Sequence, residues 1–274
     1  EPDPGTLDPE LLEQAIENLL AKGKKPAALI FVHLYGIPAK ADKILSIAAK
    51  HNIPVIEDAA EALGAEYHST RCGNFGAVSI LSFNSNKVIT SGGGGMLLTA
   101  DKDLAAKAHY FATQAKDEGA VMNHREVGYN YRMNHVNATL GASQFTKLNE
   151  RIQKRREICE FYKQSLGSLP GISFLSEQPQ TCSSRWLTTL FIDPSASGGV
   201  ARSQVQQALT KENIESRPVW KPMHLQPVFK DAPTYINGVS ERLFTQGLCL
   251  PSGSNLSPQD LERISSVIKN VFKI

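Results

Sequence analysis

Two short apolar runs, separated by an amphipathic helical pattern, constrain the fold of this chain most strongly. The first run covers residues 27–32 (AALIFV), and the second covers residues 54–56 (PVI) and ends in Glu57-Asp58. Between them, residues 40–50 repeat apolar side chains at helical spacing. A strand, a helix and a second strand in this order form a right-handed crossover between parallel strands that are buried on both faces. The sequence therefore predicts an α/β fold with a mainly parallel sheet.

Further helices and strands are predicted on both sides of this unit. They are a first helix from Pro9 capped by Asp8, strands at 77–83 and 96–99, a helix at 102–116, a long helix at 137–167, strands at 172–175 and 186–192, a helix at 203–211, and a last helix after Ser257-Pro258. The middle of the long helix is dense in charge, which is typical of a helix that links two bodies. We therefore expect a large domain at 1–150 and a smaller α+β domain at 151–274.

Composition excludes several classes of protein. The 29 Lys and Arg residues nearly balance 27 Asp and Glu residues, and a net charge of +2 provides no basic surface for nucleic acid. No apolar run approaches the ~20 residues that span a membrane. The four cysteines are scattered, without a CxxC pair or a Cys/His cluster, so neither a metal site nor a disulfide framework is indicated. We expect a cytoplasmic protein with reduced thiols.

Asp58 is the first candidate for a functional residue. It follows a strand that is predicted to be parallel, and open α/β sheets bind ligands at the carboxyl ends of such strands. The alternative is that Asp58 only caps the segment that follows it, residues 59–64.

Lys87 is the second candidate, between a strand that ends in Ser82-Phe83 and the glycine run 92–95. The residue order of a P-loop is absent, which argues against a phosphate cradle. A Schiff base with a carbonyl cofactor suits this lysine better, because flanking strands can exclude water from the amine and thereby lower its pKa. The glycines would then let the backbone approach a bulky cofactor. The alternative is an ordinary solvated loop lysine.

A third feature is the stretch 128–132 (GYNYR), whose alternative interpretation is an aromatic-rich surface loop. The three features gain meaning together. Pyridoxal phosphate requires a lysine for its aldehyde, a carboxylate for its pyridine nitrogen and donors for its phosphate. Lys87, Asp58 and Ser82 match these three requirements.

Longer motifs point in the same direction. They are VHLYGIPAKAD, VIEDAAEALGA, GNFGAVSILSFNSNKVITSGGGG, GYNYRMNHVNATLGASQ, RPVWKPMHLQPVF and GLCLPSGSNLS. In this order they closely resemble the DegT/DnrJ/EryC1/StrS family of sugar aminotransferases, and the similarity covers nearly the whole chain. The resemblance implies a fold-type I aminotransferase that works as a homodimer, uses pyridoxal 5′-phosphate and follows a ping-pong double displacement.

The resemblance also assigns roles to single positions. It makes Lys87 the lysine that forms the Schiff base and Asp58 the partner of the pyridine nitrogen. Glu61 falls where many members have a glutamine against the cofactor ring. Ser82 matches a phosphate-binding hydroxyl, and Asn130 matches a phosphate contact from the other subunit. Relatives that dehydrate sugars have a histidine at the position of Lys87, so the lysine favours amino transfer.

The motifs FNSNKVITSGGGG and EDAAEALG suggest a substrate, because they are similar to the UDP-4-amino-4,6-dideoxy-N-acetylglucosamine transaminase branch. This branch aminates UDP-linked 4-keto-6-deoxy sugars for bacterial surface glycans, usually with glutamate as the amino donor. Arg217, Lys221 and His224 lie where the family lines the way in for the sugar nucleotide. The alternative is a basic Pro-rich loop with an ordinary surface histidine.

The chain departs from the family pattern at its start. The family normally has a preceding segment with a Gly-Thr/Ser turn at a helix N-terminus that holds the phosphate, and an aromatic residue that stacks on the ring. Gly5-Thr6 is no substitute, because no strand precedes it. A second hypothesis is therefore a truncated or catalytically silent family member, completed by a separate polypeptide. A third is a nucleotide-binding α/β module without covalent chemistry.

Overall fold

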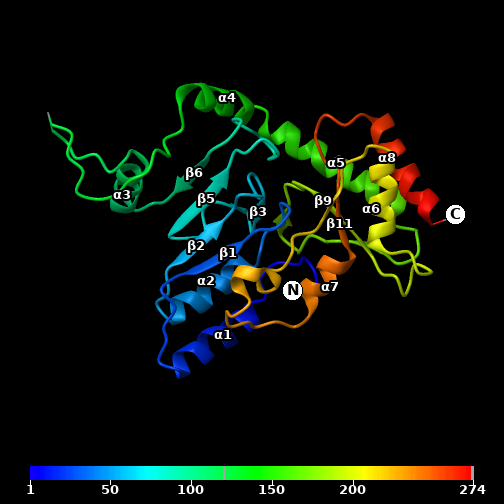
Figure 1. Ribbon diagram of the computed structural model, residues 1–274, viewed down its shortest axis with the longest axis horizontal. Helices are drawn as coiled ribbons and strands as arrows, with labels where there is room; N and C mark the ends of the chain where they lie inside the picture. The colour runs from blue at the N-terminus through cyan, green and yellow to red at the C-terminus, as the bar shows by residue number, and fades with distance from the viewer. Residues whose placement is uncertain (120, 273–274) are drawn as a thin grey trace.

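The computed structural model of the protein describes residues 1–119 and 121–272 (Figure 1). The strand–helix–strand unit consists of β1 (Leu29–Val32), α2 (Ala41–Lys50) and β2 (Val55–Asp58), with the two strands parallel. β5 (Val78–Ser82) adds parallel to β2, and β6 (Gly95–Leu98) adds antiparallel at the edge. The predicted α/β fold with a mainly parallel sheet is confirmed.

Two helices cover one face of this sheet. α1 (Pro9–Ala21) begins where predicted, because the Asp8 side chain accepts hydrogen bonds from the N–H groups of Glu10 and Leu11. α1 and α2 bury their apolar sides against β1 and β2. The core formed in this way includes Leu12, Ile16, Phe31, Ile44 and Val55.

The opposite face of the sheet exposes apolar side chains. Ile30, Ile80 and Leu97 are 62%, 36% and 44% exposed. Because strand side chains alternate between faces, Asp58 lies on this face beside Ile80, whereas Glu57 lies on the covered face. The expectation that both faces are buried is therefore wrong for the described residues, since no described helix shields these side chains from solvent.

A long helix, α5 (Leu148–Leu166), leads from the first sheet to a second core (Figure 1). The second sheet is antiparallel throughout, in the order β10-β11-β9-β7. Its strands are β7 (Ile172–Phe174), β9 (Thr188–Ile192), β10 (Arg217–Pro218) and β11 (Gly247–Leu250). Helices α6 (Arg202–Lys211) and α8 (Pro258–Val271) share its core with α5. We propose that the domain boundary lies near residue 150, in the first turn of α5.

Shorter elements connect these parts. A small sheet pairs β3 (Glu66–Tyr67) with β4 (Thr70–Arg71) and with β8 (Thr181–Cys182). The segment between β10 and β11 contains the 3₁₀ turns η1 (Met223–Leu225) and η2 (Pro227–Phe229) and the helix α7 (Val239–Gln246).

Two predicted helices end differently from expectation. The helix at 102–116 is α3 (Lys102–Ala112), which stops early because Gln114 and Ala115 have left-handed backbone conformations, with φ of 71° and 49°. The long helix at 137–167 is two helices, α4 (His135–Phe145) and α5. Between them, the N–H of Lys147 donates to the carbonyl three residues earlier, that of Gln144, instead of the one four residues earlier. None of the side chains of α4 is buried, whereas α5 buries one side of the helix.

None of the helices described has both the length and the apolar character needed to cross a membrane. The four cysteines are free thiols, of which three are buried and Cys182 is exposed.

Candidate active site

Lys87 lies in a loop after β5 that closes on itself. This lysine loop covers residues 83–91. At its two ends, the carbonyl of Phe83 accepts a hydrogen bond from the N–H of Ser91, and the N–H of Phe83 donates to the carbonyl of Gly94. Val88 and Ile89 anchor the loop in an apolar cluster, at 3% and 1% exposed. The lysine is therefore held in a fixed loop and is half-buried, and the alternative of an ordinary solvated loop lysine does not describe its surroundings.

The amine of Lys87 lies over an indole ring. Its Nζ is 4.0 Å from the ring centroid of Trp186, a residue that is only 2% exposed. The indole nitrogen of Trp186 donates to the carbonyl of Asn86 at 2.7 Å, which ties the ring to the lysine loop. Burial lowers the pKa of Lys87, and the carboxylates of Glu61 and Asp58 partly oppose this shift. Such an amine is closer to its nucleophilic form at neutral pH than a free lysine is.

Asp58 ends β2 at the carboxyl edge of the sheet, as predicted. One carboxylate oxygen, Oδ1, accepts a hydrogen bond from the N–H of Ala60 at 3.0 Å. Asp58 thus also caps the chain that follows, although residues 59–64 form turns and not a helix. The other oxygen, Oδ2, has no hydrogen-bond partner among the described residues and can accept a hydrogen bond from a ligand.

Glu61 is held from two sides. Its Oε2 accepts from the N–H of Tyr35 at 2.8 Å, and its Oε1 accepts from the indole nitrogen of Trp220 at 3.0 Å. The Tyr35 hydroxyl in turn accepts a hydrogen bond from the backbone N–H of Trp220 at 2.8 Å. Burial raises the pKa of Glu61 above its usual value, despite these hydrogen bonds and the nearby charge of Lys87. The structure therefore brings Lys87, Asp58 and Glu61 into one site.

The aromatic side chains of this site were missed by sequence reasoning. Trp186, Trp220 and Tyr35 follow no helical or strand period that would single them out. In the fold they form a cluster: Tyr35 stacks on Trp220 with ring centroids 5.8 Å apart, and Trp186 lies tilted against Trp220 at 6.2 Å. The available signals were the positions of Tyr35 in the motif VHLYGIPAKAD and of Trp220 in RPVWKPMH, beside the candidate basic residues.

Ser82 and Asn130, the two predicted phosphate contacts, are not brought together. Ser82 ends β5 opposite Gly95, and its hydroxyl accepts a long hydrogen bond of 3.4 Å from Asn84. Asn130 is exposed on the segment between α3 and α4, where it forms a bridge with Thr113. No contact among the described residues links Asn130 to Ser82.

The glycine run near Lys87 has a local explanation. Gly92 and Gly94 adopt left-handed conformations, with φ of 82° and 89°. A Cβ atom at Gly95 would lie 2.4 Å from the carbonyl oxygen of Leu81. The turn between β5 and β6 therefore requires glycine at positions 92, 94 and 95, whereas Gly93 has no such local requirement.

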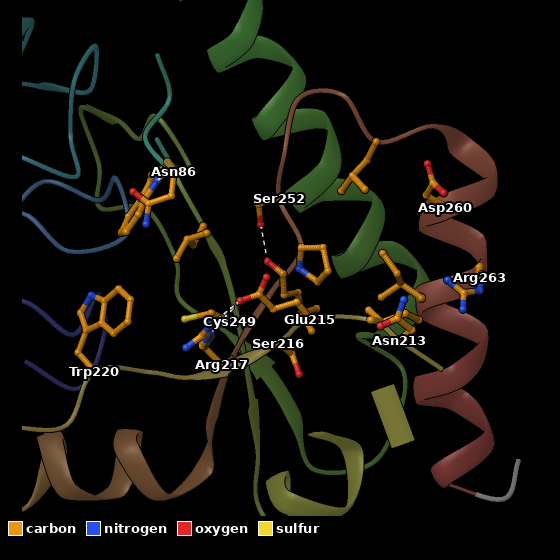
Figure 2. A pocket seen from close by; sticks show the side chains of 17 residues that line it. Asn86, Asn213, Glu215, Ser216, Arg217, Trp220, Cys249, Ser252, Asp260 and Arg263 are labelled. Atoms are coloured by element: carbon orange, nitrogen blue, oxygen red, sulfur yellow. Dashed lines mark hydrogen bonds and ion pairs between the residues drawn. The ribbon is translucent and has the colours of Figure 1, made fainter. Parts of the chain in front are cut away.

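A cleft of about 650 Å³ opens next to the lysine loop (Figure 2). Asn86, Trp186, Trp220 and Arg217 are among its lining residues. Of the three predicted substrate residues, only Arg217 lines this cleft, and its guanidinium donates to Glu215 at 2.7 Å.

The other two predicted substrate residues have different surroundings. Lys221 is exposed outside the lining of the cleft. His224 is half-buried and pairs through Nε2 with Glu241 of α7, at 2.9 Å. The alternative of an ordinary loop therefore describes their contacts within this chain.

A buried polar network lies beneath the site, on the covered face of the sheet. His33 donates through Nε2 to Glu57 at 2.9 Å, and its Nδ1 accepts from the N–H of Ala39 at 2.8 Å, which fixes the neutral tautomer. Glu57 also accepts from Gly73, Phe75 and Ser79. Burial acts to raise the pKa of Glu57, but these hydrogen bonds outweigh it and hold the pKa below its usual value.

Cys72 completes a group with His33 and Glu57 whose potential metal-ligand atoms lie within 4.8 Å of one another. Both ring nitrogens of the histidine and both carboxylate oxygens of Glu57 are already engaged with protein donors or acceptors. Burial also raises the pKa of the Cys72 thiol well above its usual value, which disfavours the thiolate that binds metal. This cluster is therefore a structural network that joins β1 to β2.

Comparison with known proteins identifies relatives of nearly the whole chain. Residues 1–269 match the DegT/DnrJ/EryC1/StrS aminotransferase family. The chain is 43% identical to a pyridoxal phosphate-dependent aminotransferase named EpsN from Bacillus subtilis, over 99% of this chain and 70% of that protein. It is 35% identical to a GDP-perosamine synthase from Caulobacter vibrioides, over 89% of this chain and 66% of that protein.

A solved structure extends the agreement to the fold. An aminotransferase of this family from Brucella abortus matches with a TM-score of 0.89 and 28% identity, over 100% of this chain and 72% of that one. The sequence relatives and the structure thus lead to the same family. The chain belongs to the DegT/DnrJ/EryC1/StrS family, whose members are pyridoxal phosphate-dependent sugar aminotransferases.

Proposed function

We propose that this chain transfers an amino group, from glutamate, to a nucleotide-linked 4-keto-6-deoxy sugar in the synthesis of amino sugars for bacterial surface glycans. The observation that carries this proposal is the placement of Lys87 over Trp186, within electrostatic reach of Asp58 and Glu61. A half-buried amine with a lowered pKa beside two carboxylates suits covalent chemistry with a carbonyl group.

The residues present fit pyridoxal phosphate. Lys87 offers the amine, the free oxygen of Asp58 can accept a hydrogen bond from the ring nitrogen, and the Ser82 hydroxyl can contact the phosphate. The bound cofactor would supply an aldehyde for the amine and an electron-withdrawing ring. We propose that Glu61 lies against this ring, where many relatives have glutamine.

The protein side chains have separate tasks in this scheme. The Lys87 amine accepts a proton from one carbon and returns it to another, a task for which a lowered pKa is suited. Asp58 would hold the cofactor ring nitrogen through a charge-assisted hydrogen bond to its free carboxylate oxygen. Trp186 covers one side of the amine and excludes water from it.

The nucleotide is the part of the substrate that needs a direct test. The resemblance favours UDP, whereas the name of the Caulobacter relative contains GDP. Arg217, which lines the cleft, can pair with a diphosphate if it leaves Glu215. We propose Lys221 and His224 as further contacts on the approach to the cleft.

We further propose that the protein is a cytoplasmic homodimer. The segment from α3 to α4 exposes many apolar side chains: Val121, Met122, Val127, Tyr129, Tyr131, Val136, Leu140 and Phe145. A second subunit that covers this segment would also bring Asn130 to the phosphate. Four free thiols agree with a reducing compartment.

The purified chain, incubated with pyridoxal phosphate, tests the proposal. We expect a visible absorbance band, loss of this band on borohydride reduction, and mapping of the reduced adduct to Lys87 by mass spectrometry. The adduct should be absent from Lys87→Ala. An intact, folded chain that forms no adduct would contradict the proposal and support the silent alternative.

The loaded protein is then given glutamate with either a UDP-linked or a GDP-linked 4-keto-6-deoxyhexose. A product in which an amine replaces the ketone is expected with one nucleotide at least ~10-fold better than with the other. Release of 2-oxoglutarate in the absence of sugar identifies glutamate as donor. An adduct that forms at Lys87 but aminates neither sugar would contradict the substrate proposal alone.

A further inference from the structure

Arg155 is a buried cation that the proposed chemistry does not use. It lies on α5, is 6% exposed and forms no ion pair with any carboxylate among the described residues. Burial lowers its pKa to about 10, and the like charge of Arg151 adds to this. Its Nε is also without a partner in the part of the chain described. A buried charge without a counterion is costly and requires an explanation.

The contacts of Arg155 converge on the lysine loop. One terminal nitrogen of its guanidinium donates to the carbonyl of Trp186, and the other donates to the carbonyl of Lys87 at 3.5 Å. Trp186 in turn donates from its indole to the carbonyl of Asn86. Two side chains therefore hold the consecutive carbonyls of residues 86 and 87, and Arg155 also fixes the backbone of Trp186.

The position of Arg155 along α5 makes it a junction between two cores. One and two turns earlier, Ile152 and Leu148 pack in the apolar cluster that contains Val88 and Trp186. One turn later, Ile158 belongs to the core of the second sheet. Arg155 is thus the polar residue on the buried side of α5 at the point where the helix passes from one cluster to the other.

We propose that Arg155 is a positioning residue for Lys87: together with Trp186 it fixes the backbone of the lysine loop, so that the amine stays over the indole ring and faces Asp58 and Glu61. This inference rests on the proposed role of Lys87. An apolar side chain of similar size would fill the space but could not bind two carbonyls at once, whereas a guanidinium presents a rigid fork of donors.

The role can be measured without catalysis. In the chain without added cofactor, brief labelling with acetic anhydride across pH, followed by mass spectrometry, reports the titration of Lys87. The groups facing the amine are Asp58 and Glu61, which are unchanged in the variants. We expect Arg155→Met to raise the apparent pKa of Lys87 by about one pH unit, because a loosened loop exposes the amine to water.

Matched variants separate positioning from stability. Arg155→Lys keeps the charge but not the fork, so its shift should be intermediate. Lys154→Met removes a partly exposed cation of the same helix, which among the described residues pairs with Glu157, and should leave the Lys87 titration unchanged. Binding of pyridoxal phosphate to Arg155→Met should weaken by at least ~10-fold, with partial recovery in Arg155→Lys.

The outcomes distinguish this inference from the proposed function. No adduct at Lys87 in the wild-type chain overturns the proposed function, whatever Arg155 does. An adduct in the wild type, with an unchanged Lys87 titration in folded Arg155→Met, overturns the positioning role. If Arg155→Met does not fold, Trp186→Phe replaces it, because it retains a ring but loses the donor to Asn86. An unchanged titration in both Trp186→Phe and Arg155→Lys would likewise overturn the role.

Discussion

Trp220 donates a hydrogen bond from its indole nitrogen to Glu61 at 3.0 Å, across 159 residues of sequence. This bond ties the segment after β10 to the turn that follows Asp58. The Trp220 backbone N–H also donates to the Tyr35 hydroxyl, so the segments that follow β1 and β2 hold the same tryptophan. The second sheet thereby contributes one wall of the proposed active site.

Replacing Glu61 by glutamine should release Trp220. A carboxylate accepts from both Tyr35 and Trp220, whereas a carboxamide has one acceptor oxygen and its NH₂ group would face the other donor. Trp220 is one of only two tryptophans in the chain, so its fluorescence can be isolated in a Trp186→Phe background. We expect acrylamide to quench Trp220 more strongly after Glu61→Gln. Equal quenching would show that the bond does not hold the indole.

The sequence predicted the first sheet well because its strands are short apolar runs and its crossover helix is amphipathic. Asp58 and Lys87 could be found because each lies at or just after the end of a predicted strand, and these strands determine where both residues lie in the fold. The exposed face of the sheet was not predictable, since Ile30 and Ile80 have the same chemistry whether or not another element covers them.

Other parts of the site depend on contacts between distant segments. Trp186 meets Asn86 across 100 residues, and no local period indicates this pairing. The charge-dense pattern of α5 predicted a helix that links two bodies, but it did not indicate that Arg155 is buried. Periodicity treats a charged residue as exposed, and only the fold shows where carbonyl groups compensate for its burial.

Acid should destabilise the fold through Glu57. Its pKa is lowered in the folded protein, so its stabilising contribution is present above the unfolded-state value, about 4.3, and is lost as the pH falls towards the folded-state value. We expect the free energy of unfolding, measured with urea, to decrease below about pH 5.

Variants of the same network assign this effect. In Glu57→Gln the amide group would face donors on every side, and the free energy of unfolding at pH 7 should fall by about 3 kcal/mol with a weaker acid dependence. Ser79→Ala removes one donor of the same carboxylate and should cost only about 1 kcal/mol. An unaltered acid dependence in Glu57→Gln would assign the effect to other carboxyl groups.

The second core offers a test of one buried hydrogen bond. The Tyr162 hydroxyl donates to the carbonyl of Pro251 at 3.0 Å, and the residue is fully buried. Tyr162→Phe keeps the ring but leaves this carbonyl without its donor, so urea unfolding should show a loss of about 1 kcal/mol. Tyr162→Ala also creates a cavity and should cost about 3–5 kcal/mol. Equal losses would indicate that ring packing contributes nothing here.

The exposed side of α4 should carry part of the proposed dimer interface. Val136 and Leu140 are 80% and 44% exposed, and their spacing of four residues places them on one side of the helix. Leu140→Asp should convert the dimer to a monomer in light scattering coupled to size-exclusion chromatography, because an unpaired carboxylate in an apolar interface is strongly unfavourable. Ala138→Asp, on the opposite side of the same helix, should leave the dimer intact. If Leu140→Asp and the wild type have the same mass, α4 lies outside the interface.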